Sequence, residues 1–110
     1  MSIGIVTVAY GDAYRRFLPE WLQAVSDLQH LPDELVIVSD TYIELFHARA
    51  QEIAGPITWI TSEVEPEQYP LTLVNQGIAS LSTEWVCKMD VDDLFPPHAL
   101  NGVEECEGDV

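Results

Sequence analysis

Four short apolar runs alternate along the chain with longer segments whose apolar residues recur every three or four positions. The short runs are rich in β-branched residues and mostly lack a clean polar alternation, which is typical of strands covered on both faces of a sheet. The predicted strands are Ile3 to Ala9, Leu35 to Ser39, Ile57 to Ile60 and Trp85 to Met89. This alternation predicts an α/β fold with a mostly parallel sheet, helices on both faces and right-handed crossovers.

Three helices are predicted between these strands and a fourth after them. Their approximate ranges are Ala13 to Gln29, Tyr42 to Ala54, Leu71 to Leu81 and Pro97 to Cys106. Pro19 predicts a bend or a late start in the first helix. The acidic segment from Glu63 to Pro70 contains two prolines and no periodicity, so we expect a surface loop there. A chain of 110 residues allows one domain, and we expect residues 1–110 to form it.

An acidic triplet, Asp90-Val91-Asp92, follows the last predicted strand. Two prolines soon after it forbid a longer strand and an immediate helix, which places the triplet in a loop at a strand's carboxyl end. Ligands bind at that edge of open α/β sheets, and Mg²⁺ or Mn²⁺ is commonly held by one or two carboxylates together with substrate phosphates. The alternative is an acidic turn that caps the next helix. An EF-hand is excluded, because the loop lacks a glycine at its sixth position and has Asn101 at its twelfth.

A second carboxylate, Asp40, follows the strand that ends at Ser39. It too stands at the carboxyl end of a predicted strand, where ligands bind. The alternative role for Asp40 is that of N-cap for the helix predicted to begin near Tyr42.

The net charge of −15, from 19 acidic and 4 basic residues, is unevenly distributed. Residues 1–55 hold three arginines against eight acids, which gives −5, and residues 56–110 hold only Lys88 against eleven, which gives −10. Such a chain should repel nucleic acid and anionic lipid. With so few cations, binding of a diphosphate would depend on a metal ion, backbone N–H groups and a helix N-terminus. The charge also permits a different class of function, an acidic decoy that blocks a basic partner.

No apolar run approaches the length of a membrane span, and the start of the chain lacks the basic flank of a signal peptide. We therefore expect an intracellular protein, placed in the cytoplasm. Two cysteines, Cys87 and Cys106, are too few for a disulfide framework and are expected to be free thiols.

Four pieces in this order resemble the nucleotide-binding half of the GT-A fold glycosyltransferases, in particular the large inverting family 2. The first two are the strand ends Ala9-Tyr10 and Ser39-Asp40. The more specific two are the helix with Asn75-Gln76-Gly77 before Thr83-Glu84-Trp85-Val86, and Met89-Asp90-Val91-Asp92-Asp93-Leu94-Phe95-Pro96-Pro97. The resemblance covers almost the whole chain. It implies a truncated GT-A fold that binds a nucleoside-diphosphate sugar, a UDP-sugar first among them, with Mn²⁺ or Mg²⁺.

The resemblance also implies roles for single residues. Ala9 and Tyr10 would line the base pocket, and Asp40 would hydrogen-bond the base. Asp92 would ligate the metal, and Asp90 would face the ribose or the metal's water shell. Asn75 is also counted with the donor-binding residues, and Asp93 would cap the next helix or support Asp92.

Three features depart from the family pattern. The family's usual Pro-Thr-Tyr-Asn after the first strand is Val8-Ala9-Tyr10-Gly11 here, and its usual acidic pair after the second strand is Ser39-Asp40. The acceptor-binding half and a residue that matches the family's general base are expected to be missing from this chain, so a homodimer or a partner chain is expected to cover the exposed sheet edge. A non-catalytic donor-binding or interaction module is therefore an alternative to a transferase.

Overall fold

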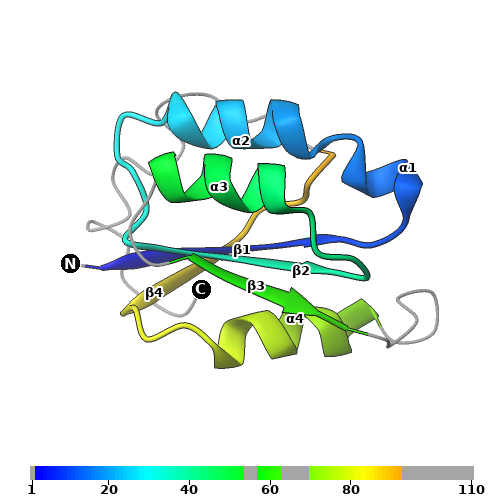
Figure 1. Ribbon diagram of the computed structural model, residues 1–110. Coiled ribbons are helices and arrows are strands. Elements are labelled where there is room, and N and C mark those ends of the chain that lie inside the picture. Colours follow the sequence, from blue (N-terminus) through cyan, green and yellow to red (C-terminus); the bar gives the residue numbers. More distant parts are fainter. Residues whose placement is uncertain (1, 54–56, 63–69, 93–110) are drawn as a thin grey trace.

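Four parallel strands form the centre of the structure, a computed structural model that describes residues 2–53, 57–62 and 70–92 (Figure 1). The strands are β1 (Ile3–Ala9), β2 (Glu34–Ser39), β3 (Ile57–Thr61) and β4 (Trp85–Lys88). They lie in the order β3-β2-β1-β4, and every neighbouring pair is parallel. The predicted α/β class and the four predicted strands are confirmed, with strand ends that differ by one residue at most.

The strand order reverses at β1. The chain first builds the sheet outward from β1 to β2 and β3, and then returns to place β4 on the other side of β1. Ile3 of β1 is level with Trp85 of β4, and Val6 is level with Lys88. A right-handed crossover requires the connecting helix to change face when the order reverses.

The helices follow that rule. They are α1 (Asp12–Arg15), α2 (Leu18–Ser26), α3 (Glu44–Ile53) and α4 (Pro70–Ala79). Figure 1 shows α2 and α3 side by side on one face of the sheet and α4 on the opposite face, and α4 packs on β1 and β2. The predicted coverage of both faces is confirmed.

The predicted helix from Ala13 to Gln29 is two helices in the structure. The short α1 ends at Arg15, and α2 begins at Leu18 with Pro19 in its first turn. A proline is tolerated there because the first N–H groups of a helix have no partner within the helix. Pro19 thus marks a late start, one of the two outcomes that its position allowed.

Other boundaries moved slightly. Helix α3 begins at Glu44, two residues after the predicted start, and α4 begins at Pro70 and ends at Ala79, before Leu81. Most of the expected loop before Pro70, the helix expected at 97–106 and Cys106 lie outside the described residues.

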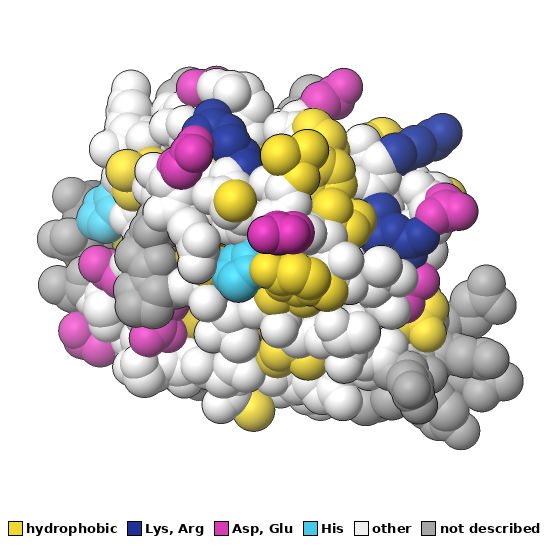
Figure 2. Space-filling model, in the orientation of Figure 1, with side chains coloured by type: hydrophobic (Ala, Val, Ile, Leu, Met, Phe, Trp, Pro, Cys, Tyr) yellow, Lys and Arg dark blue, Asp and Glu magenta, His cyan; other side chains and the backbone are white. Residues whose placement is uncertain are grey.

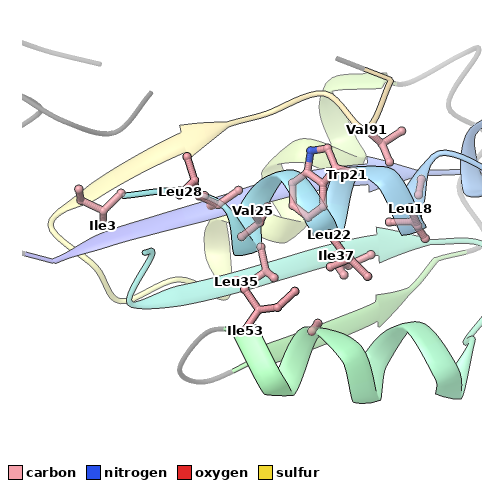
Figure 3. Packing of buried hydrophobic residues seen from close by; sticks show 13 residues of the cluster. Ile3, Leu18, Trp21, Leu22, Val25, Leu28, Leu35, Ile37, Ile53 and Val91 are labelled. Carbon is pink, nitrogen blue, oxygen red and sulfur yellow. The ribbon is translucent and has the colours of Figure 1, made fainter. Parts of the chain in front are cut away.

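The larger core cluster lies between the sheet and the α2 and α3 layer. All the positions of the stripe predicted for the first helix pack in it: Leu18, Trp21, Leu22, Val25 and Leu28 are buried, and the partly buried Phe17 packs against them. Figure 3 shows Trp21 and Leu18 of α2 with Val91, which follows β4, close to them. A smaller cluster covers the α4 face. Gly77 lets α4 approach the sheet, because a Cβ there would stand 2.3 Å from Cγ2 of Val6.

No helix in the part of the chain that the structure describes is long and apolar enough to cross a membrane.

Candidate functional site

The carboxyl ends of the parallel strands bring the predicted site segments to one edge of the sheet. Tyr10 follows β1, Asp40 follows β2, and Met89 to Asp92 follow β4. Since β1 and β4 are neighbours, the backbone N–H of Met89 donates to the carbonyl oxygen of Val6 at 3.1 Å. The reversal of strand order between β1 and β4 is the topological switch point, outside which open α/β sheets bind their ligands.

Val91 anchors the acidic triplet to the core. Its side chain is 4% exposed and belongs to the larger core cluster, next to α2 in Figure 3. Asp90 and Asp92, on either side of it in sequence, are exposed. The buried valine fixes the loop, so that both carboxylates lie at the surface.

Asp90 already has a cation beside it. The Nζ atom of Lys88 lies 3.2 Å from Asp90 Oδ1, and both side chains are about half exposed. An ion pair exposed to this degree contributes little to stability, because solvent screens it and ordering two side chains costs entropy. Little free energy is therefore lost if Asp90 gives up Lys88 and binds another cation instead.

The donor set at the triplet fits a hard divalent cation. Carboxylate oxygens are the ligands that Mg²⁺ and Mn²⁺ prefer, and two of them leave positions for substrate phosphates and water. No group of three or more His, Cys, Asp or Glu side chains gathers as a metal site within residues 2–53, 57–62 and 70–92. Asp93 lies outside these residues, so the role expected for it is not described.

Asp40 is held by donors from the segment that follows β1. Its Oδ1 accepts a hydrogen bond from the backbone N–H of Gly11 at 3.1 Å and another from the guanidinium of Arg15, which also pairs with Asp12. Gly11 has a φ of 84°, a conformation that favours glycine. Asp40 thus joins the end of β2 to the turn after β1, rather than serving as the N-cap proposed as its alternative role, since α3 begins only at Glu44.

Ser39 adds a second link between the same strand ends. Its hydroxyl donates to the carbonyl oxygen of Ala9 at 2.7 Å and lies 3.3 Å from Asp40 Oδ1. The hydroxyl oxygen accepts the N–H of Thr41 at 3.3 Å. Ser39 is fully buried, and its hydrogen bonds explain why a polar residue is tolerated there.

The Asp40 and Arg15 pair is electrostatically well matched. Burial alone raises the pKa of Asp40, but the hydrogen bonds from Arg15 and Gly11 and the charge of Arg15 outweigh it, so the pKa is lowered. The hydrogen bond to Asp40 raises the pKa of Arg15. Because its pKa is lowered, Asp40 is an ionised carboxylate, which can only accept hydrogen bonds. Figure 2 shows basic side chains at the α1 end of the molecule with acidic side chains beside them.

The other predicted site residues are placed differently. The side chain of Ala9 is fully buried in the larger cluster, so only its backbone faces the edge of the sheet. Tyr10 is partly buried against the smaller cluster on the α4 face. Asn75 is exposed in the middle of α4, and no described hydrogen bond connects it with Asp40 or Asp90. The structure brings the backbone of Ala9 together with Asp40, and leaves Asn75 on a different element.

Sequence reasoning missed Gly11, Arg15 and Ser39. The signal for Arg15 was the scarcity of cations: in a chain with 4 basic and 19 acidic residues, each basic side chain has many possible acidic partners. The partner itself could not be read, because Arg15 and Asp40 are 25 residues apart in the chain.

A group of three aromatic rings lies on α3, β3 and the segment that follows Asp40, where Trp59 Nε1 donates to the carbonyl oxygen of Thr41 at 3.2 Å. Tyr42 packs edge-on against His47 and Trp59, with ring centroids 5.4 and 5.6 Å away, and its hydroxyl lies 2.8 Å from His47 Nδ1. Figure 2 shows hydrophobic side chains over this part of the molecule with a histidine beside them. These contacts secure the edge strand β3 to α3.

Comparisons of the chain with models of protein families, with curated proteins and with solved structures gave no match.

Proposed function

We propose that the protein binds a nucleoside-diphosphate sugar, a UDP-sugar first among them, together with Mn²⁺ or Mg²⁺. In this proposal it transfers the sugar to an acceptor, or helps another chain to do so, and it acts in the cytoplasm as a homodimer or with a partner chain. Nucleic acid is not among its ligands. The observation that supports the proposal most is the placement of exposed Asp90 and Asp92 around buried Val91 at the switch point of the sheet.

Each residue has a defined task in this proposal. Asp92 and Asp90 hold the divalent cation, which when bound neutralises charge on the diphosphate. Asp40 accepts a hydrogen bond from the base, next to the backbone of Ala9 and Tyr10. Asn75 contributes to the donor site only if the ligand reaches α4.

The alternative is a module that binds the donor, or another protein, without turnover. The scarcity of cations favours a metal-dependent mode for any phosphate ligand, because three of the four basic side chains, Arg15, Arg49 and Lys88, are already paired with Asp40, Glu52 and Asp90. An acidic decoy would instead bind a basic partner without metal.

The test is calorimetric titration of UDP, GDP and TDP sugars, with and without Mn²⁺, on the wild-type chain and on Asp92→Asn. The substitution removes a charge and weakens an oxygen ligand while keeping the size of the side chain. We expect Asp92→Asn to lose most of its donor affinity and its dependence on Mn²⁺, with a melting temperature that is unchanged or slightly raised. Asp27→Asn is the matched control, an exposed acid at the end of α2.

Three outcomes separate the interpretations. Donor affinity that is the same in Asp92→Asn and the wild type would refute the metal role of Asp92. A loss of stability of about 1 kcal/mol in Asp92→Asn, with no change in binding, would indicate a helix cap instead. Donor binding without sugar transfer to any tested acceptor would favour the module without turnover.

A further inference from the structure

The side chain of Arg15 is largely removed from solvent although Arg15 stands on a helix of four residues. Its side chain is 16% exposed, while Asp12, one of its two partners, is 98% exposed. The other partner, Asp40, is 27% exposed. A bond between Arg15 and Asp12 within one turn of helix would leave Arg15 at the surface, so the position of Arg15 follows from its contact with Asp40.

The contacts of Asp40 are uneven between its two oxygens. Those from Gly11, Arg15 and Ser39 all end on Oδ1. The backbone N–H of Asp40 itself also hydrogen-bonds the carboxylate. Because the three contacts that the described part of the chain shows from other residues all fall on Oδ1, Oδ2 is the oxygen offered to a ligand. Because Oδ1 is tied to α1 and to the turn at Gly11, the carboxylate cannot turn to offer both oxygens at once.

One available carboxylate oxygen distinguishes the nucleotide bases. Uracil and thymine present a single ring N–H between two carbonyl groups, which matches one acceptor. Guanine presents two adjacent donors, which are best matched by both oxygens of a free carboxylate. Adenine and cytosine place an acceptor nitrogen beside their amino group, and an ionised carboxylate repels that nitrogen.

We propose that Arg15 is a positioning residue that holds Asp40 with one oxygen available, and that it thereby selects a uracil or thymine nucleotide over a guanine nucleotide. The inference rests on the proposed function, in which Asp40 meets the base. It assigns to Arg15 an indirect role, through Asp40, and it requires no contact between Arg15 and the ligand.

The experiment measures the affinities of UDP, TDP, GDP and ADP in the presence of Mn²⁺ for the full chain and for Arg15→Met, which keeps the aliphatic stem and removes the donors. We expect the wild type to prefer UDP and TDP. In Arg15→Met the affinity for UDP should fall about tenfold while that for GDP stays nearly unchanged, so that the UDP-to-GDP preference also falls about tenfold. Arg15→Lys keeps the charge but not the planar fork, and it should restore part of the preference.

A second measurement separates positioning from a purely structural role. The affinity for UDP is followed as the pH is lowered, and Arg15→Met is compared with the wild type because UDP itself titrates. Without Arg15, Asp40 should protonate at a higher pH, so the variant should lose affinity at a higher pH than the wild type. Arg49→Met is the matched control, because Arg49 pairs with Glu52 on α3, and it should match the wild type in both measurements.

The outcomes distinguish the inference from the proposed function. If the wild type binds none of the four diphosphates, both fail. If it binds UDP and Arg15→Met weakens UDP and GDP equally, with an unshifted pH profile, the proposed function stands and the role of Arg15 is refuted. If Arg15→Met does not fold, Arg15→Lys decides: an unchanged UDP-to-GDP ratio and an unshifted pH profile overturn the inference, and a reduced ratio supports it.

Discussion

Truncation of Val91 should destabilise the fold even though the residue lies between two exposed aspartates. Its side chain is 4% exposed and packs in the cluster that contains Leu18 and Trp21 of α2 (Figure 3). Val91→Ala removes two methyl-sized groups. The folded state loses the free energy gained by burying them, about 1.6 kcal/mol at about 0.8 kcal/mol for each. The sheet and α2 hold the surrounding side chains in place, so part of the cavity should persist and add to this cost. We expect a total loss of about 2 to 3 kcal/mol in the free energy of unfolding.

Urea unfolding, followed by tryptophan fluorescence, measures this loss as a lower midpoint with an unchanged slope. Leu45→Ala is the control, because Leu45 is 73% exposed on α3, and its truncation should cost less than about 0.5 kcal/mol. If Val91→Ala is no more costly than Leu45→Ala, Val91 is not anchored in the core, and the explanation given for the exposure of Asp90 and Asp92 fails.

Two further predictions concern stability. Gly77→Ala should gain about 1 kcal/mol of helix propensity. The new Cβ would, however, stand 2.3 Å from Val6 Cγ2, so we expect a net loss of about 1 kcal/mol in the free energy of unfolding from overpacking. Asn75→Ala, at an exposed position of the same helix, is the control, and an equal gain in stability from both substitutions would contradict the close approach of α4 to the sheet. The second concerns acid. The folded-state pKa of Asp40 is lowered from 3.8, so the stabilisation from its pair with Arg15 is present above that pH and is lost as the pH falls through the lower folded-state value. Urea unfolding should therefore show a destabilisation by Arg15→Met near neutral pH that shrinks below about pH 4, and a destabilisation independent of pH would refute the ionic origin of the effect.

The hydrophobic pattern alone was sufficient for the fold class. Strands buried on both faces are continuous apolar runs, and the helix between them shows its stripe at Leu18, Trp21, Leu22 and Val25, all of which are buried. Local chemistry was less certain at the ends of elements. Pro19 allowed both a bend and a late start, and the structure has the late start because α1 ends at Arg15, before α2 begins.

The site was predicted in outline only. The position of Asp40 and of Asp90 to Asp92 at the carboxyl edge of the sheet followed from strand direction, since parallel strands end on the same side. The surroundings of Asp40 did not follow, because Gly11 and Arg15 reach it through a contact between segments 25 or more residues apart. Sequence spacing carries no information on which side chain a carboxylate meets across such a distance.

By itself the sequence determined the elements, their parallel arrangement and the edge at which the acidic residues lie, because these depend on periodicity and chain direction. Only the tertiary structure decided the strand order β3-β2-β1-β4, which makes β1 and β4 neighbours and places the acidic triplet beside the end of β1. It also decided that Val91 is buried while Asp90 and Asp92 are exposed, and that Arg15 pairs with Asp40. Packing of α2 against the sheet and the electrostatic match of one arginine with one carboxylate determine these features, and both depend on residues that only the fold brings together.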